Sequence, residues 1–310
     1  MRYKLGVDLG GTHIGAGLVD ANGNLLKKLY VPTPENRDFD ETVKAIIKAV
    51  ERLLEEYGAN ISCCDSIGIG SPGVAEEETG KIVFSTNFQW YDQPLGERLK
   101  EHFNIHVHVG NDADVAGWAE YLMGAGKGSK SCVTITLGTG VGGGLVLNGR
   151  LFSGGMLGGA ELGHVTLIAG GARCTCGKEG CAEAYCSASA LIRQAEEGLL
   201  QGRKSVLKSG LEAKDVVDAA RAGDEFASEL FANYVENLAH LLSSIINLLA
   251  PEIIALGGGV SKAGDFLLEP LRKRVAELVL NKSLPHAKIV CAQMGNDAGI
   301  IGAALLEGTN

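Results

Sequence analysis

The chain has 310 residues, more than the about 100–150 residues usual for one domain, so two domains are the first expectation. Hydrophobic residues make up 45% of it, and its formal net charge of −9 argues against a nucleic-acid surface, which needs clustered positive charge. No apolar run approaches the roughly 20 residues of a membrane span, and the first residues leave no room for a signal peptide. We therefore expect a cytoplasmic protein.

The first third of the chain predicts a hairpin of strands followed by alternating helices and strands. Apolar runs and the Asn22-Gly23 turn predict strands at 5–9, 14–20 and 25–31. Apolar residues at helical spacing predict a helix over 38–57 that Gly58 ends. We further expect strands at 66–70 and 105–109, and helices at 95–103 and 113–123.

The pattern of strand, glycine turn, strand and Asn-Gly turn occurs a second time, at residues 132–152. The first glycine of the turn precedes the hairpin asparagine by 12 residues in one copy (Gly10 to Asn22) and by 10 in the other (Gly138 to Asn148). Two such units in one chain indicate duplicated domains. Later residues predict helices at 225–249, 266–280 and 297–306, with strands at 253–256 and 288–291.

Three glycine clusters follow apolar strands, as in turns that bind phosphate. In the first cluster, Asp8 is followed by Gly10, Gly11 and Thr12, which supplies a carboxylate for a Mg²⁺ shell, backbone amides and a hydroxyl. It is neither a Walker A loop nor a dinucleotide fingerprint, because no Gly-Lys-Ser/Thr and no helix follow. The other clusters are Gly138–Gly144 and Gly257–Gly259. An ordinary strand-to-strand turn is the alternative for the first cluster taken alone.

Three cysteines and a histidine predict a structural zinc site. Cys174, Cys176 and Cys181 fall within eight residues, and His164 precedes them by ten. A Cys₃His set is a usual closed tetrahedral zinc site, whereas a disulfide is disfavoured in the cytoplasm. Buried inert thiols are the other alternative, and Cys186 is a possible fifth donor.

Asn111-Asp112 stands between a predicted strand and a predicted helix, a usual position for a catalytic acid. Phosphoryl transfer to an alcohol needs a base that accepts the hydroxyl proton, and Asp112 can do this. Asp112 can equally be an N-cap of the helix, and Asp114 is the competing base. Glu161, His164 and Glu183 surround the cysteines and suit a polyhydroxyl ligand, with surface carboxylates as the alternative.

Taken together, these residues resemble the ROK family (repressors, open reading frames and kinases). The resemblance rests on Asp8–Thr12, Ser71-Pro72-Gly73, Asn87 with Trp90, Asn111-Asp112, the glycines from Gly138, Glu161-Leu-Gly-His164, and Cys174-x-Cys176 with Cys181-x-Glu183. It extends from the first strand to the last helix and is closest to the bacterial glucokinases of the family. Because the first glycine motif begins at Asp8, we do not expect the DNA-binding helix-turn-helix of the family's repressors.

The resemblance implies an α/β protein of the two-lobed, actin-like (ribonuclease-H-type) ATPase fold, with a cleft between duplicated domains. The small lobe would be residues 1–112 with the C-terminal helix 296–310. The large lobe would be residues 113–295, with the zinc site and a dimerisation surface. A homodimer or homotetramer is expected.

The resemblance also implies roles for single residues. Asp112 would be the base that accepts the proton of the sugar 6-hydroxyl, and His164 would serve both metal and sugar. The other sugar ligands would be Gly73, Asn87, Asn111, Glu161 and Glu183. ATP with Mg²⁺ would contact Asp8, Gly10, Gly11, Thr12, Thr139, Gly140, Gly258 and Gly259.

The expected function is ATP-dependent phosphorylation of a hexose at its 6-hydroxyl, with glucose as the first candidate. N-acetylmannosamine kinase and fructokinase are the alternatives among enzymes, since their sites share the glutamates and the histidine. A sugar-sensing, ATP-binding module without turnover is the non-enzymatic alternative.

Overall fold

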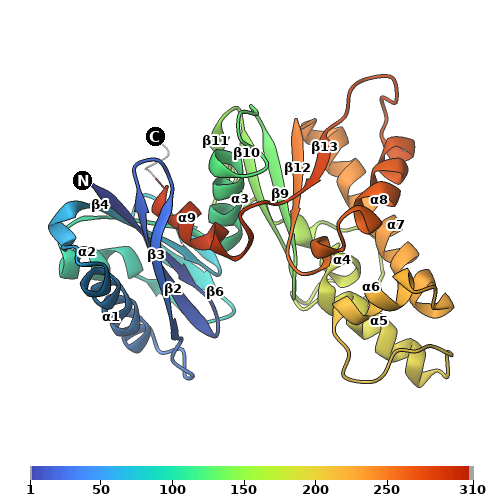
Figure 1. The fold of residues 1–310 in the computed structure, drawn as a ribbon, viewed down its shortest axis with the longest axis horizontal. Helices are drawn as coiled ribbons and strands as arrows, with labels where there is room; N and C mark the ends of the chain where they lie inside the picture. Colours follow the sequence, from blue (N-terminus) through green and yellow to red (C-terminus); the bar gives the residue numbers. More distant parts are fainter. Residues whose placement is uncertain (1, 307–310) are drawn as a thin grey trace. The chain divides into compact units, whose positions relative to one another are not determined.

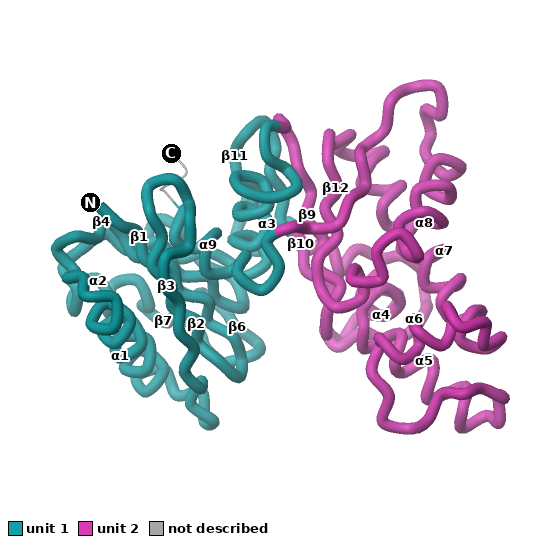
Figure 2. Tube along the Cα trace, viewed as in Figure 1, with its two compact units in different colours: residues 1–128, 144–160, 294–310 teal, residues 129–143, 161–293 magenta. Residues whose placement is uncertain are grey.

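The computed structural model describes residues 2–306 as a mixed α/β protein (Figure 1). The chain divides into two compact units, coloured separately in Figure 2. Unit 1 comprises the residues up to 128, residues 144–160 and the residues from 294 onward. Unit 2 comprises residues 129–143 and 161–293. Within residues 2–306, no helix has both the length and the apolar character needed to cross a membrane.

The sheet of unit 1 has five strands in the order β3-β2-β1-β4-β8. Its strands are β1 (Tyr3–Leu9), β2 (His13–Asp20), β3 (Leu25–Pro32), β4 (Cys64–Ser71) and β8 (His106–Asn111). β1, β2 and β3 pair antiparallel, whereas β1, β4 and β8 run parallel. The carboxyl ends of the three parallel strands therefore meet at one edge of the sheet.

Successive side chains of a strand point to opposite faces of the sheet. In β1, Leu5, Val7 and Leu9 belong to a hydrophobic core that includes residues of α1 (Phe39–Tyr57) and α2 (Leu95–Phe103). The opposite face packs against α9 (Ala298–Ala304), which in turn packs against α3 (Asp112–Met123). A β-carbon on Gly6 would lie 1.9 Å from a backbone carbonyl oxygen of α9, so the close approach of α9 requires glycine there.

The second sheet repeats the strand order of the first as β11-β10-β9-β12-β13. Its strands are β9 (Cys132–Leu137), β10 (Val141–Leu147), β11 (Arg150–Leu151), β12 (Ile253–Gly257) and β13 (Lys288–Cys291). Asn148 and Gly149, between β10 and β11, both have positive φ, as the predicted hairpin turn needs. The duplication expected from the sequence is thus confirmed in the strand order, and the division into units falls within β10.

The helices of unit 2 lie between its sheet strands in the sequence. They are α4 (Glu183–Cys186), α5 (Ala188–Leu200), α6 (Ala213–Arg221), α7 (Glu225–Leu249) and α8 (Asp265–Leu278). The predicted helix 225–249 is confirmed at both ends, and the helix predicted at 266–280 lies one to two residues earlier. The helices α4, α5 and α6 were not predicted from the sequence.

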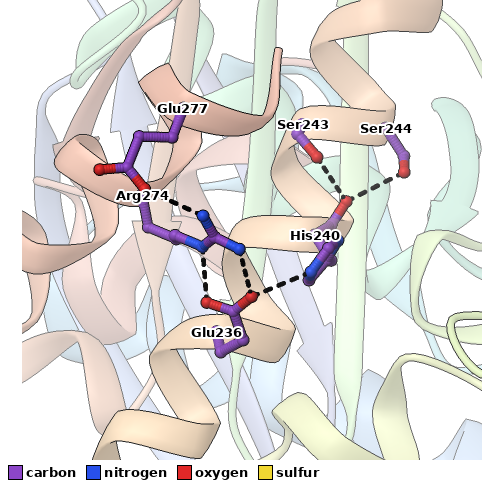
Figure 3. A network of polar contacts seen from close by, with 6 residues as sticks. All are labelled: Glu236, His240, Ser243, Ser244, Arg274 and Glu277. Atoms are coloured by element: carbon purple, nitrogen blue, oxygen red, sulfur yellow. Dashed lines mark hydrogen bonds and ion pairs between the residues drawn. The ribbon is translucent and has the colours of Figure 1, made fainter.

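An ion-pair network joins α7 and α8 on the surface of unit 2 (Figure 3). Arg274 donates two hydrogen bonds of 2.7 Å to the Glu236 carboxylate and one of 2.9 Å to Glu277. His240 contacts the same Glu236 at 3.0 Å. The hydrogen bonds from Arg274 lower the pKa of Glu236. Because these side chains are partly exposed, we regard the network as fixing the register of the two helices rather than as a large source of stability.

A small antiparallel sheet of three strands was not expected from the sequence. It consists of β5 (Val74–Glu76), β6 (Lys81–Ser85) and β7 (Trp90–Gln93), in that order. The described residues also contain four 3-10 turns, at Ile61–Cys63, Leu162–His164, Val260–Ala263 and Gly295–Asp297. The small sheet matters for function because the loop between β6 and β7 carries Asn87.

The compact units differ from the domain boundary predicted at residue 112. Residues 113–128 and 144–160 belong to unit 1, because α3 packs against α9 and β4 rather than standing with unit 2. Gly302 of α9 illustrates the contact, since a β-carbon there would lie 1.7 Å from the Val115 carbonyl oxygen. The division into a small lobe (1–112 with 296–310) and a large lobe (113–295) therefore stays a prediction. Residues 1 and 307–310 of the predicted small lobe lie outside the described residues.

Candidate functional site

The polar candidates of unit 1 gather at the edge where its parallel strands end. Asp8 of β1 pairs in register with Gly70 of β4, and Gly70 pairs with Gly110 of β8. Asn111 and Asp112 follow directly, at the junction of β8 and α3. The carboxyl edge of a parallel sheet is where α/β proteins usually place their ligands. The structure therefore brings Asp8, Asn111 and Asp112 to one place.

Asn111 joins the start of α3 to the loop after β4. Its side-chain oxygen accepts hydrogen bonds from the backbone amides of Ala113 (2.8 Å) and Asp114 (3.2 Å), so Asn111 is the N-cap of α3. Its amide nitrogen donates to the Gly73 carbonyl oxygen at 2.9 Å. The alternative that Asp112 is the N-cap is therefore wrong. Asp112 is the first residue of the helix, and Asp114 is a buried acid of the first turn.

The two acids at this edge both have raised pKa values. Burial raises the pKa of Asp8 to about 6, with a further contribution from the negative charge of Asp112. Burial also raises the pKa of Asp112, against the opposing effect of the backbone amide of Ala113, which donates to its carboxylate at 2.9 Å. A buried carboxylate that is costly to ionise is suited to accept a proton or to bind a cation. This edge therefore has the electrostatics of a catalytic site.

Thr33, which was not predicted from the sequence, donates two hydrogen bonds to the glycine turn after β1. The Thr33 hydroxyl donates to the Gly10 carbonyl oxygen at 2.7 Å, and the Thr33 amide donates to the Thr12 carbonyl oxygen at 2.9 Å. The amides of Gly11 and Thr12 have no backbone acceptor among residues 2–306. At this turn the carbonyl oxygens of Gly10 and Thr12 already accept hydrogen bonds, whereas the amides of Gly11 and Thr12 have no backbone acceptor in the described part of the chain. The turn therefore favours an anion over a cation as its ligand.

Gly73 and Asn87 lie on segments that contact each other. Gly73 has a φ of 108°, and a β-carbon there would lie 2.2 Å from the Phe84 carbonyl oxygen in β6. Asn87 is exposed in the loop that follows β6, where its backbone carbonyl accepts a hydrogen bond from the Arg37 guanidinium. The glycine at 73 is thus required both by its backbone conformation and by the close packing of the small sheet.

Unit 2 contains the predicted cysteine and histidine cluster. One ligand atom from each of His164, Cys174, Cys176 and Cys181 lies within 4.8 Å of the others. The Sγ atoms of Cys176 and Cys181 are 3.7 Å apart, and Nδ1 of His164 is 3.7 Å from Sγ of Cys174. Metal–ligand bonds of about 2.3 Å in a tetrahedron place ligands about 3.7 Å apart, so the donor set fits Zn²⁺.

Glu183 connects this cluster to the glycine turn between β9 and β10. One carboxylate oxygen accepts from the Thr175 hydroxyl at 2.8 Å and from the Cys174 thiol at 3.5 Å. The other accepts from the Val141 amide at 3.1 Å, and a β-carbon on Gly140 would lie 2.4 Å from it. The cluster and the turn are therefore coupled through one side chain.

The two glycine turns of unit 2 lie against each other. Gly258 has a φ of 84°, and a β-carbon there would lie 2.4 Å from the carbonyl oxygen of Leu137, the last residue of β9. Thr139 and Gly259 are exposed next to these contacts. Both segments consequently present backbone at the carboxyl ends of β9 and β12, which run parallel.

The predicted site residues thus form two groups, one on each unit. Unit 1 carries Asp8, Gly10, Gly11, Thr12, Gly73, Asn87, Asn111 and Asp112, and unit 2 carries Thr139, Gly140, Glu161, His164, the three cysteines, Glu183, Gly258 and Gly259. Glu161 is exposed, and its carbonyl oxygen accepts from the His164 amide at 3.0 Å. Sequence analysis missed Thr33 and Arg37, because no motif marks residues that reach the site from another loop.

The raised pKa of Asp8 predicts a pH-dependent stability. Because the pKa is about 6 in the folded chain and about 3.9 in an unfolded one, ionised Asp8 destabilises the fold increasingly as the pH rises towards and through 6. In Mg²⁺-free buffer at pH 8, we expect Asp8→Asn to raise the free energy of unfolding by about 2 kcal/mol. Urea denaturation should show the gain shrinking as the pH is lowered towards 4. If the gain in unfolding free energy of Asp8→Asn over the unchanged protein is no larger at pH 8 than at pH 4, the assignment is wrong.

The whole chain matches known proteins. The model of the ROK family matches residues 4–309. The glucokinase of Halalkalibacterium halodurans is 40% identical over 314 residues, covering 98% of this chain and 94% of that protein. The glucokinase of Thermotoga maritima is 37% identical over 307 residues, covering 97% and 95%.

Solved structures agree with the sequence relatives. The ROK family glucokinase of Streptomyces griseus, crystallised with glucose and AMPPNP, has a TM-score of 0.79 and 35% identity, covering 97% of this chain and 98% of that one. The chain therefore has the actin-like ATPase fold that the resemblance implied. On the matched family model and on these identities, the chain belongs to the ROK family.

Proposed function

We propose that this protein is an ATP-dependent hexose kinase that phosphorylates the 6-hydroxyl of glucose. The observation that carries the proposal is that full-length relatives at 36–40% identity are glucokinases. The Streptomyces griseus relative was solved with glucose and an ATP analogue, which supports both substrates. N-acetylmannosamine and fructose stay the alternatives from the sequence, and no contact among the described residues favours them.

Asp112 is the proposed catalytic base. Its carboxylate would accept the proton of the sugar 6-hydroxyl as the oxygen bonds to the γ-phosphorus and the bond from that phosphorus to the bridging oxygen of ADP breaks. Burial, which raises the pKa of Asp112, makes the carboxylate a better proton acceptor than an exposed aspartate. Asn111 supports this role, since it fixes the helix turn on which Asp112 stands.

The nucleotide would be held by the glycine turns of both units. In unit 1, the amides of Gly11 and Thr12, which have no backbone acceptor among the described residues, suit phosphate oxygens. The Asp8 carboxylate suits the Mg²⁺ that accompanies ATP. In unit 2, we assign Thr139, Gly140, Gly258 and Gly259 to the same ligand. When bound with ATP, Mg²⁺ would neutralise part of the negative charge of the phosphates.

We propose that the cysteine and histidine cluster binds a structural Zn²⁺. Four protein ligands complete its coordination, so the ion would support the fold and carry no open position for chemistry. Nδ1 of His164 is the ring nitrogen that faces Cys174, which leaves Nε2 for a sugar hydroxyl. The other proposed sugar ligands are Gly73, Asn87, Asn111, Glu161 and Glu183, which together offer the donors and acceptors that a hexose needs.

Location and assembly follow from this chemistry as further proposals. ATP and reduced thiols are both available in the cytoplasm, where we place the protein. The family resemblance supports a homodimer or homotetramer that binds hexose and ATP. The formal net charge of −9 argues against nucleic acid as a further partner.

A substrate panel tests the proposed function. We expect kcat/KM for glucose to exceed that for mannose, fructose and N-acetylmannosamine by at least about 10-fold, because unpaired hydrogen-bonding groups penalise an analogue. ADP release in a coupled assay is the measurement. 6-Deoxyglucose is the matched control, since it keeps the ring hydroxyls and lacks the reacting one. No ADP release with any hexose would favour the non-enzymatic sugar sensor, and a higher value for another hexose would replace glucose.

A further inference from the structure

The Arg37 side chain lies between two segments of the proposed site. Its Nη1 donates to the backbone carbonyl of Asn87, in the loop proposed to bind sugar. Its Nη2 lies 3.6 Å from the position of a β-carbon on Gly11, in the turn proposed to bind phosphate. The guanidinium is also 5.8 Å from the centroid of the Phe88 ring. One cation thus contacts both segments within unit 1.

The charge of Arg37 is not neutralised by a carboxylate. Among the arginines that the structure describes before residue 100, Arg2, Arg52 and Arg98 each pair with an acid, whereas Arg37 has no ion pair. Among residues 2–306, the Arg37 guanidinium donates one hydrogen bond, to the Asn87 carbonyl oxygen. A guanidinium has five N–H donors, and the remaining ones suit a phosphate group, whose oxygens accept paired donors.

The backbone of Arg37 is held in an unfavourable conformation. Its φ of 52° lies in the left-handed region, which is costly for a residue with a β-carbon. Its amide donates to the Pro34 carbonyl at 3.0 Å, and its carbonyl accepts from Nε1 of Trp90 at 2.9 Å. Glycine or asparagine would adopt this conformation more readily, so the arginine side chain is retained at a cost.

We propose that Arg37 contacts the transferred phosphoryl group, first as the γ-phosphate of ATP and then as the 6-phosphate of the sugar product. This rests on the proposed kinase function. Arg37 exchanges no proton in the reaction: it would stabilise the charge on the phosphoryl oxygens, while Asp112 accepts the hydroxyl proton. The bond to Asn87 fixes the guanidinium beside the Gly11 turn, so the group needs no rearrangement when phosphate binds.

Arg37→Gln tests the contact, with Arg37→Lys as a second variant. We expect Arg37→Gln to lower kcat about 100-fold, as for loss of one preorganised donor, and Arg37→Lys to lower it less, because lysine keeps the charge without the planar fork. Arg98→Gln is the matched control, since Arg98 is already paired with Asp40. It should keep kcat within about twofold of the unchanged chain.

Calorimetry separates phosphate contact from positioning of Asn87. We expect Arg37→Gln to raise the Kd of glucose 6-phosphate at least tenfold more than the Kd of glucose. If both constants rise equally, Arg37 only positions the Asn87 loop, and the proposal is wrong. If the unchanged protein is an active kinase and both constants rise equally in Arg37→Gln, only the role of Arg37 is overturned. If the unchanged protein releases no ADP, the proposed function itself is overturned.

Discussion

Replacing Asp112 with asparagine should lower kcat by a factor of about 10² to 10⁴, the usual contribution of a general base. Asparagine keeps the side-chain oxygen that accepts from the Ala113 amide at 2.9 Å, so the start of α3 should be preserved. It removes only the ability to accept the hydroxyl proton. Steady-state assays with glucose and ATP measure kcat, and calorimetry should show a Kd for glucose within a few-fold of the unchanged value.

Stability provides the control for this variant. Because burial raises the pKa of Asp112, its ionised form destabilises the folded chain at neutral pH, and the neutral asparagine should not lower the melting temperature. Asp114→Asn is the matched second variant, two residues along the same helix. If Asp112→Asn keeps near-normal turnover while Asp114→Asn loses it, the base is Asp114 and our assignment is wrong.

If the cluster binds Zn²⁺ as proposed, loss of the metal should lower both stability and sugar affinity. For Cys181→Ser, whose position is fully buried, we expect an unfolding free energy lower by about 4 kcal/mol, as for a ligand lost from 1,000 times its Kd. We also expect the Kd of glucose to rise about 10- to 100-fold, because His164 and Glu183 lose the partners that orient them. Elemental analysis, thermal unfolding and calorimetry measure the three effects.

Cys63→Ser is the control for the cysteine change. Cys63 is a half-buried thiol of unit 1 and lies outside the cluster, so this variant should keep its zinc, its melting temperature and its glucose affinity.

Glu183 adds a prediction about the nucleotide, since it joins the cluster to the Val141 amide. The KM for ATP should therefore rise in Cys181→Ser as well. A zinc-free protein that melts and binds glucose normally would show that the cluster holds no functional metal.

Much of the fold could be predicted from the sequence, because its signals are local. Gly58 was predicted to end α1, and its left-handed φ is the expected conformation of a helix C-cap. The helix begins at Phe39, one residue after the predicted start, and the Asp38 side chain caps it by accepting from the Glu41 amide. The Asn148-Gly149 turn was equally predictable from two residues. The small sheet of β5, β6 and β7 and the four-residue helix α4 were not predicted, since such short elements depend on packing more than on periodicity. The helices α5 and α6 were also not predicted, although they are at least as long as the predicted α2.

The candidate site was predictable in its residue types and not in its connections. Clustered thiols with a histidine indicate a metal site whatever the fold, and the family motifs mark the other candidate site residues. The roles of Thr33, Arg37 and Glu183 as links were invisible, because each joins segments far apart in the sequence. Arg37 and Asn87, for example, are 50 residues apart and share one hydrogen bond.

By itself, the sequence determined the duplicated strand–turn–strand units, the long helices, the cluster of three cysteines and a histidine, and the family. These are encoded by residue periodicity, by turn residues and by donor atoms at short spacing. Only the tertiary structure decided that Asn111 rather than Asp112 caps α3, that α3 belongs with α9 in unit 1, and that Asp8 and Asp112 share a buried edge. The reason is physical: capping geometry, close backbone contact and raised pKa values arise from neighbours that only folding brings together.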